Sequence, residues 1–395
     1  MYPILFPVVK IGIKYKRGYP FKLKERLLPK ITGEYDFLIH LASLGEANTV
    51  SGVLSMWEDL FDKILVETVT DTGMKKINEK FNKIKTVFFP YDYIPVIIYI
   101  LKKVKIKKIV LMETELWPGM LIAAKLLGIK IIVINGKLSL STIKMLNSGA
   151  FFWKDILLNI SNWYVISQET KSFLLSYGVS ENKIKVVPDI KYLTLKNQKK
   201  DIKVNHLIKS WKKKEKLMIF GSMHQGEEQI FKEIWKINNY KFVFVPRHLN
   251  NLKELEVYFD NIGVKHGYYS DIESIDSSVK VLIVDKFGIL SSLYSVCDIA
   301  VIGGSFIPIG GHNPLEPLSF GKPVVFGKYM NNFSEIADDL LESGIAKTVL
   351  TENDLVNIIE NLSKIFNRNS ILKSTEKLND KIDTIVNTYS DLLKL

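Results

Sequence analysis

Three glutamates stand where strand-like runs give way to loops, a position from which a carboxylate can act on a bound substrate. Glu46 follows the run YDFLIH in LASLGEANTV, and Glu113 and Glu115 follow KKIVLME in METELWPG. Gly45 permits a sharp turn, after which Glu46 would open a helix at its positive end. There it can serve as a general base, or it can merely complement the helix dipole, which is the commoner case. Glu113 and Glu115 would point to the same side if the strand continues, and such a pair can orient a sugar hydroxyl or a basic side chain.

A second kind of chemistry, the binding of an anion, is indicated by the glycine-rich segment GGSFIPIGGHNPLEPLSFGKPVVFG. Asn313, Pro314 and Glu316 predict a helix start, with a capping side chain, a proline at the first helical position and a carboxylate three residues after the cap. A helix start behind glycines presents free backbone N–H groups to an anion such as phosphate. A tight turn that binds nothing is an equal alternative for a lone glycine-rich loop.

Three further loops make the phosphate interpretation sharper. VPRH ends a strand-like run, so Arg247 can serve as a fixed cation for a phosphate. VDKFGIL places Gly288 on a strand-to-helix turn that suits close backbone approach. GSMHQGEEQ leads from a strand into a helix headed by Glu227 and Glu228. Together with GGHNPLEP, these loops predict a nucleotide-phosphate pocket.

A metal site is not expected. The chain contains no Asp-x-Asp, and its 6 histidines form no cluster with ligand spacing. His224 and His248 are as well explained by structural hydrogen bonds as by catalysis.

The elements that must position these loops alternate between strand-like and helix-like runs, the pattern of stacked βα units and parallel sheets. A first series comprises YDFLIH, KILVETV, TVFFP, KKIVLME, KIIVIN, WYVIS and IKVV, and a second comprises KLMIFGS, KFVFVPRH, KVLIVDKFG, DIAVIGGS and PVVFG. We therefore predict an α/β protein of two doubly wound domains, in which ligands bind beyond the carboxyl ends of the strands. The predicted boundaries are an N-terminal domain at 1–192, a polar, lysine-rich linker at 193–215, a C-terminal domain at 216–370 and a C-terminal helix at 371–395.

The composition is that of a folded protein, with 47% hydrophobic residues and a formal net charge of +12. The single cysteine, Cys297, lies in an apolar run, which favours a small buried side chain and a reducing compartment. Lysines and arginines gather in residues 1–30 and again in 102–108. Such clusters suit an anionic partner or simply a solvated face, and because no nucleic-acid motif accompanies them, an anionic lipid surface is favoured over DNA or RNA.

The N-terminal run MYPILFPVVKIGI is apolar but short, and Pro3 and Pro7 interrupt it. No window of about 20 apolar residues exists in the sequence, so no transmembrane helix is predicted. The run also has no small-residue cleavage site, which argues against a secretory signal. Followed by lysines, it can dock on a membrane surface without crossing it.

The motifs SLGEANT, FFPYD, METELWPG, SQET, SMHQGEE, VPRH and GGSFIPIGGHNPLEP stand in one order along most of the chain. In this combination the sequence resembles the 3-deoxy-D-manno-octulosonic acid (Kdo) transferases that modify lipid A, and KYKRGYPFKLKERL resembles the basic lead-in of that family. The resemblance implies a GT-B fold, with two Rossmann-like domains facing a central cleft. It implies inverting transfer of Kdo from CMP-Kdo to the tetraacyl-disaccharide bisphosphate precursor of lipid A (lipid IVA), without a metal or another cofactor.

The resemblance also assigns roles to residues. Glu46 falls on the family's general base, and Glu113 and Lys191 fall on groups that stabilise the transition state. Closure of the cleft would assemble the site. The CMP contacts that carry over are Pro246 and Arg247, the backbone of Phe287, Gly288 and Ile289, and Asn313, Pro314, Leu315 and Glu316.

Three departures from the family pattern stand out. Pro188–Asp189 replaces a Gly-Asn or Gly-Ser pair before Lys191, Ile289 replaces an acidic residue so that only its backbone can serve, and Lys137 replaces an arginine. Many relatives carry a longer apolar N-terminal anchor, so we expect peripheral attachment to the cytoplasmic face of the inner membrane through residues 1–30. Two alternatives are a UDP-sugar 2-epimerase on the same fold and a non-catalytic, membrane-associated relative.

Overall fold

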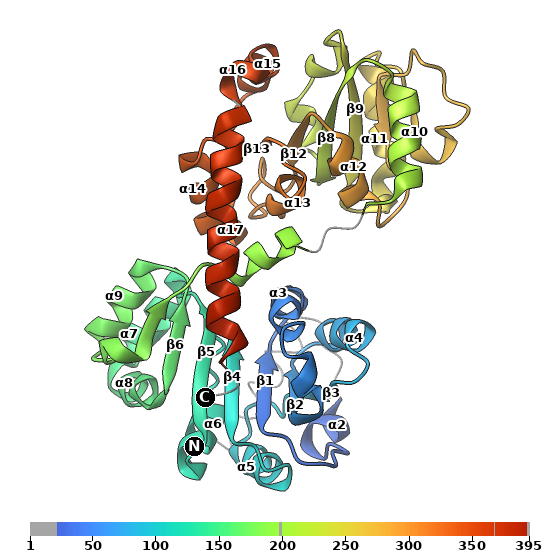
Figure 1. The fold of residues 1–395 in the computed structure, drawn as a ribbon. Coiled ribbons are helices and arrows are strands. Elements are labelled where there is room, and N and C mark those ends of the chain that lie inside the picture. Colours follow the sequence, from blue (N-terminus) through green and yellow to red (C-terminus); the bar gives the residue numbers. More distant parts are fainter. Residues whose placement is uncertain (1–21, 197–199, 367, 393–395) are drawn as a thin grey trace. The chain divides into compact units, whose positions relative to one another are not determined.

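The computed structural model describes residues 22–196, 200–366 and 368–392 (Figure 1). It divides into two units, one made of Met1–Leu193 with Lys381–Leu395 and the other of Thr194–Asp380. Within the described residues each unit contains one seven-stranded sheet. Every strand pair in both sheets is parallel, as predicted from the alternating pattern.

The sheet of the first unit has the order β3-β2-β1-β4-β5-β6-β7. Its strands are β1 (Phe37–Leu41), β2 (Ile64–Thr68), β3 (Lys85–Phe88), β4 (Lys108–Met112), β5 (Lys130–Gly136), β6 (Asn162–Val165) and β7 (Ile184–Val186). The order reverses at β1, where Phe37 pairs with Ile64 on one side and Lys108 on the other. A reversal of this kind opens a crevice at the carboxyl ends of β1 and β4, the place where ligands bind in such sheets.

The longer helices of the first unit bury apolar residues in its core. They are α2 (Leu23–Leu27), α3 (Leu44–Leu54), α4 (Asp71–Lys80), α5 (Ile94–Lys103), α6 (Pro118–Leu127), α7 (Leu140–Ser148), α8 (Ala150–Asn159) and α9 (Gln168–Ser176). α5 is an example: Ile97, Ile100 and Leu101 are buried in one apolar cluster with residues of the strands, whereas Lys102 and Lys103 are exposed. That spacing is the amphipathic pattern of a surface helix.

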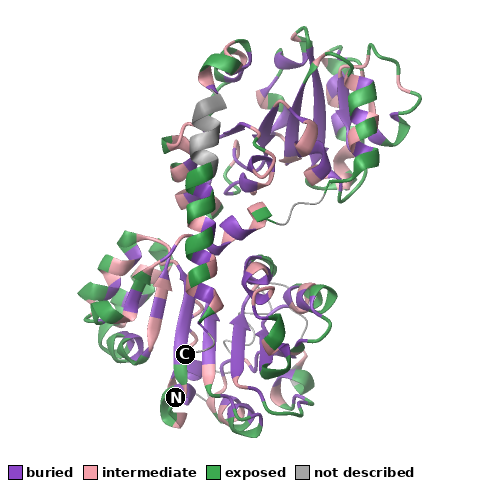
Figure 2. Cartoon of the chain, viewed as in Figure 1, coloured by how far each residue is buried: buried purple, intermediate pink, exposed green. Residues whose placement is uncertain are grey.

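The sheet of the second unit has the order β10-β11-β9-β8-β12-β13-β14. Its strands are β8 (Lys216–Met223), β9 (Tyr240–Pro246), β10 (His266–Tyr268), β11 (Val281–Ile283), β12 (Ile299–Ile302), β13 (Val324–Phe326) and β14 (Ala346–Thr348). The helices are α10 (Ile202–Lys212), α11 (Leu252–Asn261), α12 (Leu290–Val296), α13 (Leu315–Leu318), α14 (Ser334–Glu342), α15 (Glu352–Glu360) and α16 (Leu362–Ile365). The buried strands in Figure 2 carry an aromatic core in which Phe220, Trp235 and Phe242 contact one another.

The predicted strands are all confirmed, whereas two short edge strands, β10 and β14, were not predicted. The predicted linker at 193–215 is wrong in part, because residues 202–212 form the helix α10. Val204, Ile208 and Trp211 are buried along one face of this helix, and the backbone N–H of Asp201 at its start donates to Ser292 Oγ at 2.8 Å. Polar residues, among them Lys203, Lys209 and Lys212, stand between these positions and hide the apolar stripe in the sequence.

The C-terminal helix is confirmed and begins slightly earlier than predicted, as α17 (Arg368–Ser390). Its end belongs to the first unit, where Ile385 and Tyr389 are fully buried and Trp57 Nε1 donates to the carbonyl of Tyr389 at 2.9 Å. The two-domain α/β class is therefore confirmed, and the central cleft stays a prediction. Among the described residues, no helix has both the length and the apolar character that a membrane crossing requires.

Candidate active site

Glu46 lies in the first turn of α3, directly after β1, as the local pattern predicts. Ser43 is the N-cap: its Oγ accepts the backbone N–H of Glu46 at 3.2 Å and donates to Glu46 Oε1 at 2.7 Å. Glu46 Oε2 accepts the backbone N–H of Ala42 at 2.8 Å. Both carboxylate oxygens are thus held in place, and the side chain is buried.

The surroundings of Glu46 make it a weaker acid than usual. Burial, with the negative charges of Glu115 and Glu113, raises its pKa to about 7, against the opposing hydrogen bonds from Ala42 and Ser43. A carboxylate with a pKa near neutrality is still ionised in part at pH 7 and accepts a proton more readily than an ordinary glutamate. Its protonation behaviour suits a general base.

The METELWPG loop follows β4 but does not continue it. Glu113 has φ 56°, in the left-handed region, and its backbone N–H donates to the carbonyl of Ile134 at 2.9 Å. The prediction that Glu113 and Glu115 point to one side rested on a continued strand, and that premise is wrong. Glu115 Oε2 instead accepts from Trp117 Nε1 at 2.9 Å, while burial raises the pKa of Glu113 against the opposing charges of Lys191 and Lys137.

Asp92, in the FFPYD motif, accepts hydrogen bonds from the end of this loop and was not predicted as a site residue. Its two carboxylate oxygens accept the backbone N–H groups of Gly119 and Met120 at 2.7 and 2.8 Å, at the start of α6. A Cβ at Gly119 would lie 2.4 Å from the carbonyl oxygen of Asp92, so only glycine fits there. Asp92 itself has φ 56°. It therefore caps α6 from another loop and fixes the end of METELWPG.

We expect Asp92→Ala to destabilise the protein by about 2 kcal/mol, because two backbone N–H groups at a buried helix start lose their acceptor. Urea unfolding measures this loss. Asp59→Ala is the matched control, since Asp59 is exposed on the surface of the same unit. Equal unfolding midpoints for the two variants would contradict the capping role.

Lys191 follows an anchored turn. Asp189 is buried, and its Oδ1 accepts from Asn135 Nδ2 at 3.2 Å and from the backbone N–H of Lys191 at 2.8 Å. Asn135 Oδ1 accepts the backbone N–H of Ile190 at 2.8 Å. Asp189, one of the departures from the family pattern, thus fixes the backbone that carries Lys191. The charge of Lys191 lowers the pKa of Glu113, and the charge of Glu113 raises the pKa of Glu46. The three predicted catalytic side chains therefore interact electrostatically.

Two buried polar side chains of the first unit, His40 and Arg26, were also not predicted to have a structural role. His40 Nδ1 lies 2.9 Å from Glu67 Oε2 inside the core. Arg26 donates from Nη1 to the carbonyl of Phe89 at 2.8 Å and from Nη2 to that of Val69 at 2.7 Å. Arg26 is 1% exposed, so this member of the basic segment 1–30 is part of the core and does not face a partner. Residues 1–21 lie outside the described residues.

In the second unit, the predicted CMP-binding loops follow β9, β11 and β12. β9 and β12 flank β8 in the sheet, and β11 lies on the other side of β9. Pro246 ends β9, and the backbone N–H of Arg247 donates to the carbonyl of Met223 at 2.8 Å. Phe287 is 70% exposed and Gly288 has φ 86°, which places an open turn before α12. Ile289 is buried as the N-cap of α12, so its side chain belongs to the core and only its backbone is left for a ligand.

The helix predicted from Asn313 is much shorter than its pattern suggests. α13 has 4 residues, and its N-cap is Pro314. Asn313 lies one residue earlier, where its Oδ1 accepts the backbone N–H of Leu315 at 3.0 Å. Burial raises the pKa of Glu316, opposed by a hydrogen bond with Asn313 and by the charge of Arg247. The loops after β9 and β12 therefore meet, as predicted.

Glu227 joins the SMHQGEE loop to the glycine-rich loop. It is fully buried, its Oε2 accepts the backbone N–H groups of His224 and Gly304, each at 2.8 Å, and its Oε1 accepts that of Phe306 at 3.0 Å. The predicted helix headed by Glu227 and Glu228 is wrong, because only the 3-10 turn η4 (Glu228–Ile230) follows. Glu227 links the two loops through hydrogen bonds, and no local sequence pattern predicts such a role.

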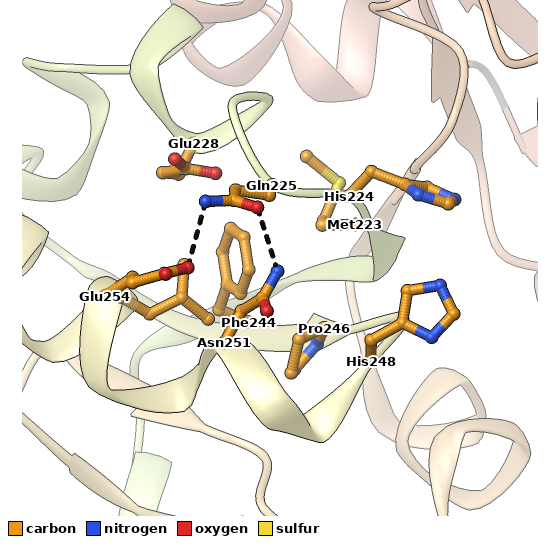
Figure 3. A pocket seen from close by; sticks show the side chains of 10 residues that line it. Met223, His224, Gln225, Glu228, Phe244, Pro246, His248, Asn251 and Glu254 are labelled. Carbon is orange, nitrogen blue, oxygen red and sulfur yellow. Dashed lines mark hydrogen bonds between the residues drawn. The ribbon is translucent and has the colours of Figure 1, made fainter.

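A pocket opens beside these loops (Figure 3). Phe244 and Pro246 line it together with polar side chains from the SMHQGEE loop and α11. Two hydrogen bonds cross it, from Asn251 Nδ2 to Gln225 Oε1 at 3.2 Å and from Gln225 Nε2 to Glu254 Oε2 at 2.9 Å. Of the predicted CMP contacts, Pro246 lines this pocket. Across the described part of both units, no group of three or more metal-ligating side chains is placed to hold an ion.

Comparison with known proteins places this site in a family. Residues 17–194 match the profile of the 3-Deoxy-D-manno-octulosonic-acid transferase (kdotransferase) family. A bifunctional glycosyltransferase/methyltransferase of Fusobacterium nucleatum is 34% identical over 344 residues, covering 85% of this chain, which spans only 54% of that protein. A 3-deoxy-D-manno-octulosonic acid transferase of Chlamydia muridarum is 30% identical over 355 residues, which are 85% of this chain and 80% of that protein.

Among solved structures, a glycosyltransferase from Rickettsia africae superposes with a TM-score of 0.60, covering 91% of this chain and 99% of that one at 16% identity. That likeness shows the fold alone, two Rossmann-like domains of the GT-B class. The sequence matches go further, because the profile match includes Glu46, Glu113 and Lys191 and the relatives extend across the second unit. The chain therefore belongs to the 3-deoxy-D-manno-octulosonic acid transferase family.

Proposed function

We propose that the protein transfers Kdo from CMP-Kdo to the lipid A precursor lipid IVA, with inversion and without a metal or another cofactor. The observation that carries the proposal is the hydrogen-bonded, buried Glu46, whose pKa of about 7 suits a general base, in a member of the Kdo transferase family. The first unit would activate the acceptor, and the second would bind the donor.

The proposed reaction is a single displacement. Glu46 takes the proton of an acceptor hydroxyl while the hydroxyl oxygen attacks the anomeric carbon of Kdo. The bond from that carbon to the phosphate oxygen breaks, and CMP leaves with the electron pair, so the configuration inverts. Lys191 supplies positive charge for the transition state. Glu113 interacts electrostatically with both Lys191 and Glu46 and would support both groups.

Donor binding is assigned to the second unit. Arg247 would bind the phosphate, and the exposed turn at Phe287–Ile289 would offer backbone groups to the nucleoside. Asn313–Glu316 would complete the site, because the charge of Arg247 acts on the pKa of Glu316 and the two segments are therefore near each other.

We further propose that the protein is peripheral to the cytoplasmic face of the inner membrane, with anionic lipid as its partner there and no nucleic acid. Lys24 and Lys30 are exposed, as are Lys102 and Lys103 on α5. Lys105 and Lys107 are paired with Glu34 and Asp36, which reduces the free charge of the second cluster. The proposal therefore relies mainly on the basic residues of segment 1–30.

The test is an assay with CMP-Kdo generated in situ and lipid IVA, with products weighed by mass spectrometry. We expect a mass gain of one or more Kdo units. A parallel incubation with UDP-N-acetylglucosamine tests the epimerase alternative, and no reaction in either arm would favour a non-catalytic relative. Absence of any Kdo addition would overturn the proposal.

The pH dependence of transfer follows from Glu46. A general base acts in its deprotonated form, and the pKa of about 7 belongs to the protein without substrate, so kcat/KM for the acceptor should fall about tenfold per pH unit below about 7 and reach a plateau above pH 8. Initial rates at acceptor concentrations well below KM, from pH 5.5 to 9, measure this decline. A rate that stays constant down to pH 5.5 would contradict the assignment of Glu46 as the base.

A further inference from the structure

Two histidines from different loops of the second unit share a hydrogen bond. His224 follows β8 and His312 follows β12, and their Nε2 atoms are 2.8 Å apart with the ring planes within 3°. Such a bond needs a proton on one nitrogen and a lone pair on the other. The pair can therefore carry a net charge of zero or +1 with the bond intact, whereas a charge of +2 would break it. It can take up one proton without moving.

The backbone holds this pair in place. Glu227 Oε2 accepts the backbone N–H groups of both His224 and Gly304, which ties the two loops together. At Gly304, with φ 67°, an added Cβ would lie 3.1 Å from His312 Cδ2 and 3.5 Å from His224 Cδ2. Both rings thus pack directly on the backbone of the glycine-rich loop, and their separation is set by the fold.

Arg247 and His248, which directly follow β9, lie near the pair. Burial, with the charges of Arg247, His224 and His248, lowers the pKa of His312 to about 4, and burial, His248 and Arg247 lower that of His224. The ring centroids of His224 and His248 are 5.8 Å apart. With no ligand present, the pair is therefore neutral at neutral pH.

The carboxylates of the same loops are already engaged. Glu227 accepts three backbone N–H groups, Glu228 accepts that of Gly226, and Glu316 is hydrogen-bonded with Asn313. Glu316 also interacts with the charge of Arg247, and an anion from outside would add further negative charge beside the two rings.

We propose that His224 and His312 form an anion-binding site that takes up one proton from solvent when the acidic donor substrate binds next to Arg247. A negatively charged oxygen next to the pair favours its protonated form. The resulting cation would also stabilise the negative charge that builds on the departing phosphate. The proton returns to solvent when the nucleotide leaves. This inference rests on the proposed function. The oxygen can come from the phosphate or from the carboxylate of the sugar acid, so the test separates the two.

Calorimetry of the full-length protein at pH 7.5, in buffers of different ionisation enthalpy, counts the protons bound with each ligand. The probes are CMP, which offers only phosphate, free Kdo, which offers only carboxylate, and sulfate, which does not titrate at this pH. We expect uptake of about 0.5 to 1 proton with CMP or with Kdo, and the arm that shows it identifies the anionic group. Binding without uptake in every arm would overturn the proposal.

Variants locate the proton. His224→Gln and His312→Asn should each abolish the uptake and weaken binding of the responding probe about tenfold, whereas His206→Asn, on the exposed face of α10, should change neither. Loss of uptake in His248→Asn with retention in the other two would assign the proton to His248 and refute the pair. Thermal unfolding confirms that each variant is folded. Uptake with sulfate but no binding of CMP would leave the anion site intact and refute CMP-Kdo as the donor, so the two failures are distinguishable.

Discussion

Glu46→Gln is expected to reduce the transfer rate by about 10²- to 10⁴-fold while CMP binding stays at the wild-type level. The amide has nearly the same shape: its oxygen can accept from the backbone N–H of Ala42, and its NH2 group can donate to Ser43 Oγ, which reverses that bond. It cannot take the proton of the acceptor hydroxyl. Initial rates of Kdo transfer and calorimetric titration with CMP measure the two quantities separately. Glu58→Gln serves as the control, because Glu58 is exposed in the same unit.

The same substitution should stabilise the folded protein at high pH. Folding raises the pKa of Glu46 from 4.5 to about 7, so ionisation of this carboxylate opposes folding. The cost is absent below about pH 4.5, grows between there and about pH 7, and is complete above it, at roughly 3 kcal/mol. Urea unfolding should therefore show Glu46→Gln to be more stable than wild type at pH 8 and similar to it at pH 4.5. Near-normal transfer, or lower stability at pH 8, would refute the role and the environment assigned to Glu46.

The parts of the site that were predicted correctly depend on local rules. Ser43 and Glu46 form a helix start through groups three residues apart, so the sequence pattern alone places Glu46. The parallel strands were equally recognisable as buried apolar runs between turns. Arg247 and Gly288 lie after β9 and β11, where ligands are expected beyond the carboxyl ends of such strands, and their roles in binding stay predictions.

The parts that were missed depend on groups far apart in the chain. Glu113 leaves the strand direction in a left-handed turn whose backbone N–H bonds to the carbonyl of Ile134 on the neighbouring strand. Asp92 caps the helix α6 through a hydrogen bond to a residue 27 positions later in the chain. Glu227 accepts a hydrogen bond from a residue 77 positions later. Arg26 looked like surface charge because its acceptors, two backbone carbonyls, have no signature in the sequence. Tertiary contacts of this kind are not encoded in any short pattern.

Arg247→Ala is expected to weaken CMP binding by about 10- to 100-fold, because a hydrogen bond to a charged group contributes about 1.5–3 kcal/mol. The position of Arg247 is set by its backbone, which is bonded to Met223 on β8, so the substitution should remove the cation without moving the loop. Arg247→Lys keeps the charge but loses the planar fork, and its affinity should lie between those of wild type and Arg247→Ala.

The control for Arg247→Ala must remove the same charge elsewhere in the unit, and Lys253→Ala does so from an exposed position on α11. If the protein attracted CMP only through its net charge of +12, the two variants would lose affinity equally and the loss would vanish at high salt. A fixed phosphate contact predicts the opposite: at 0.5 M salt, where long-range attraction is screened, Arg247→Ala should still bind at least about tenfold more weakly than Lys253→Ala. Because Arg247 also acts on Glu316 and on His312, the loss should not be restored by a new lysine on α11. Equal affinities of the two alanine variants at high salt would refute Arg247 as the phosphate contact.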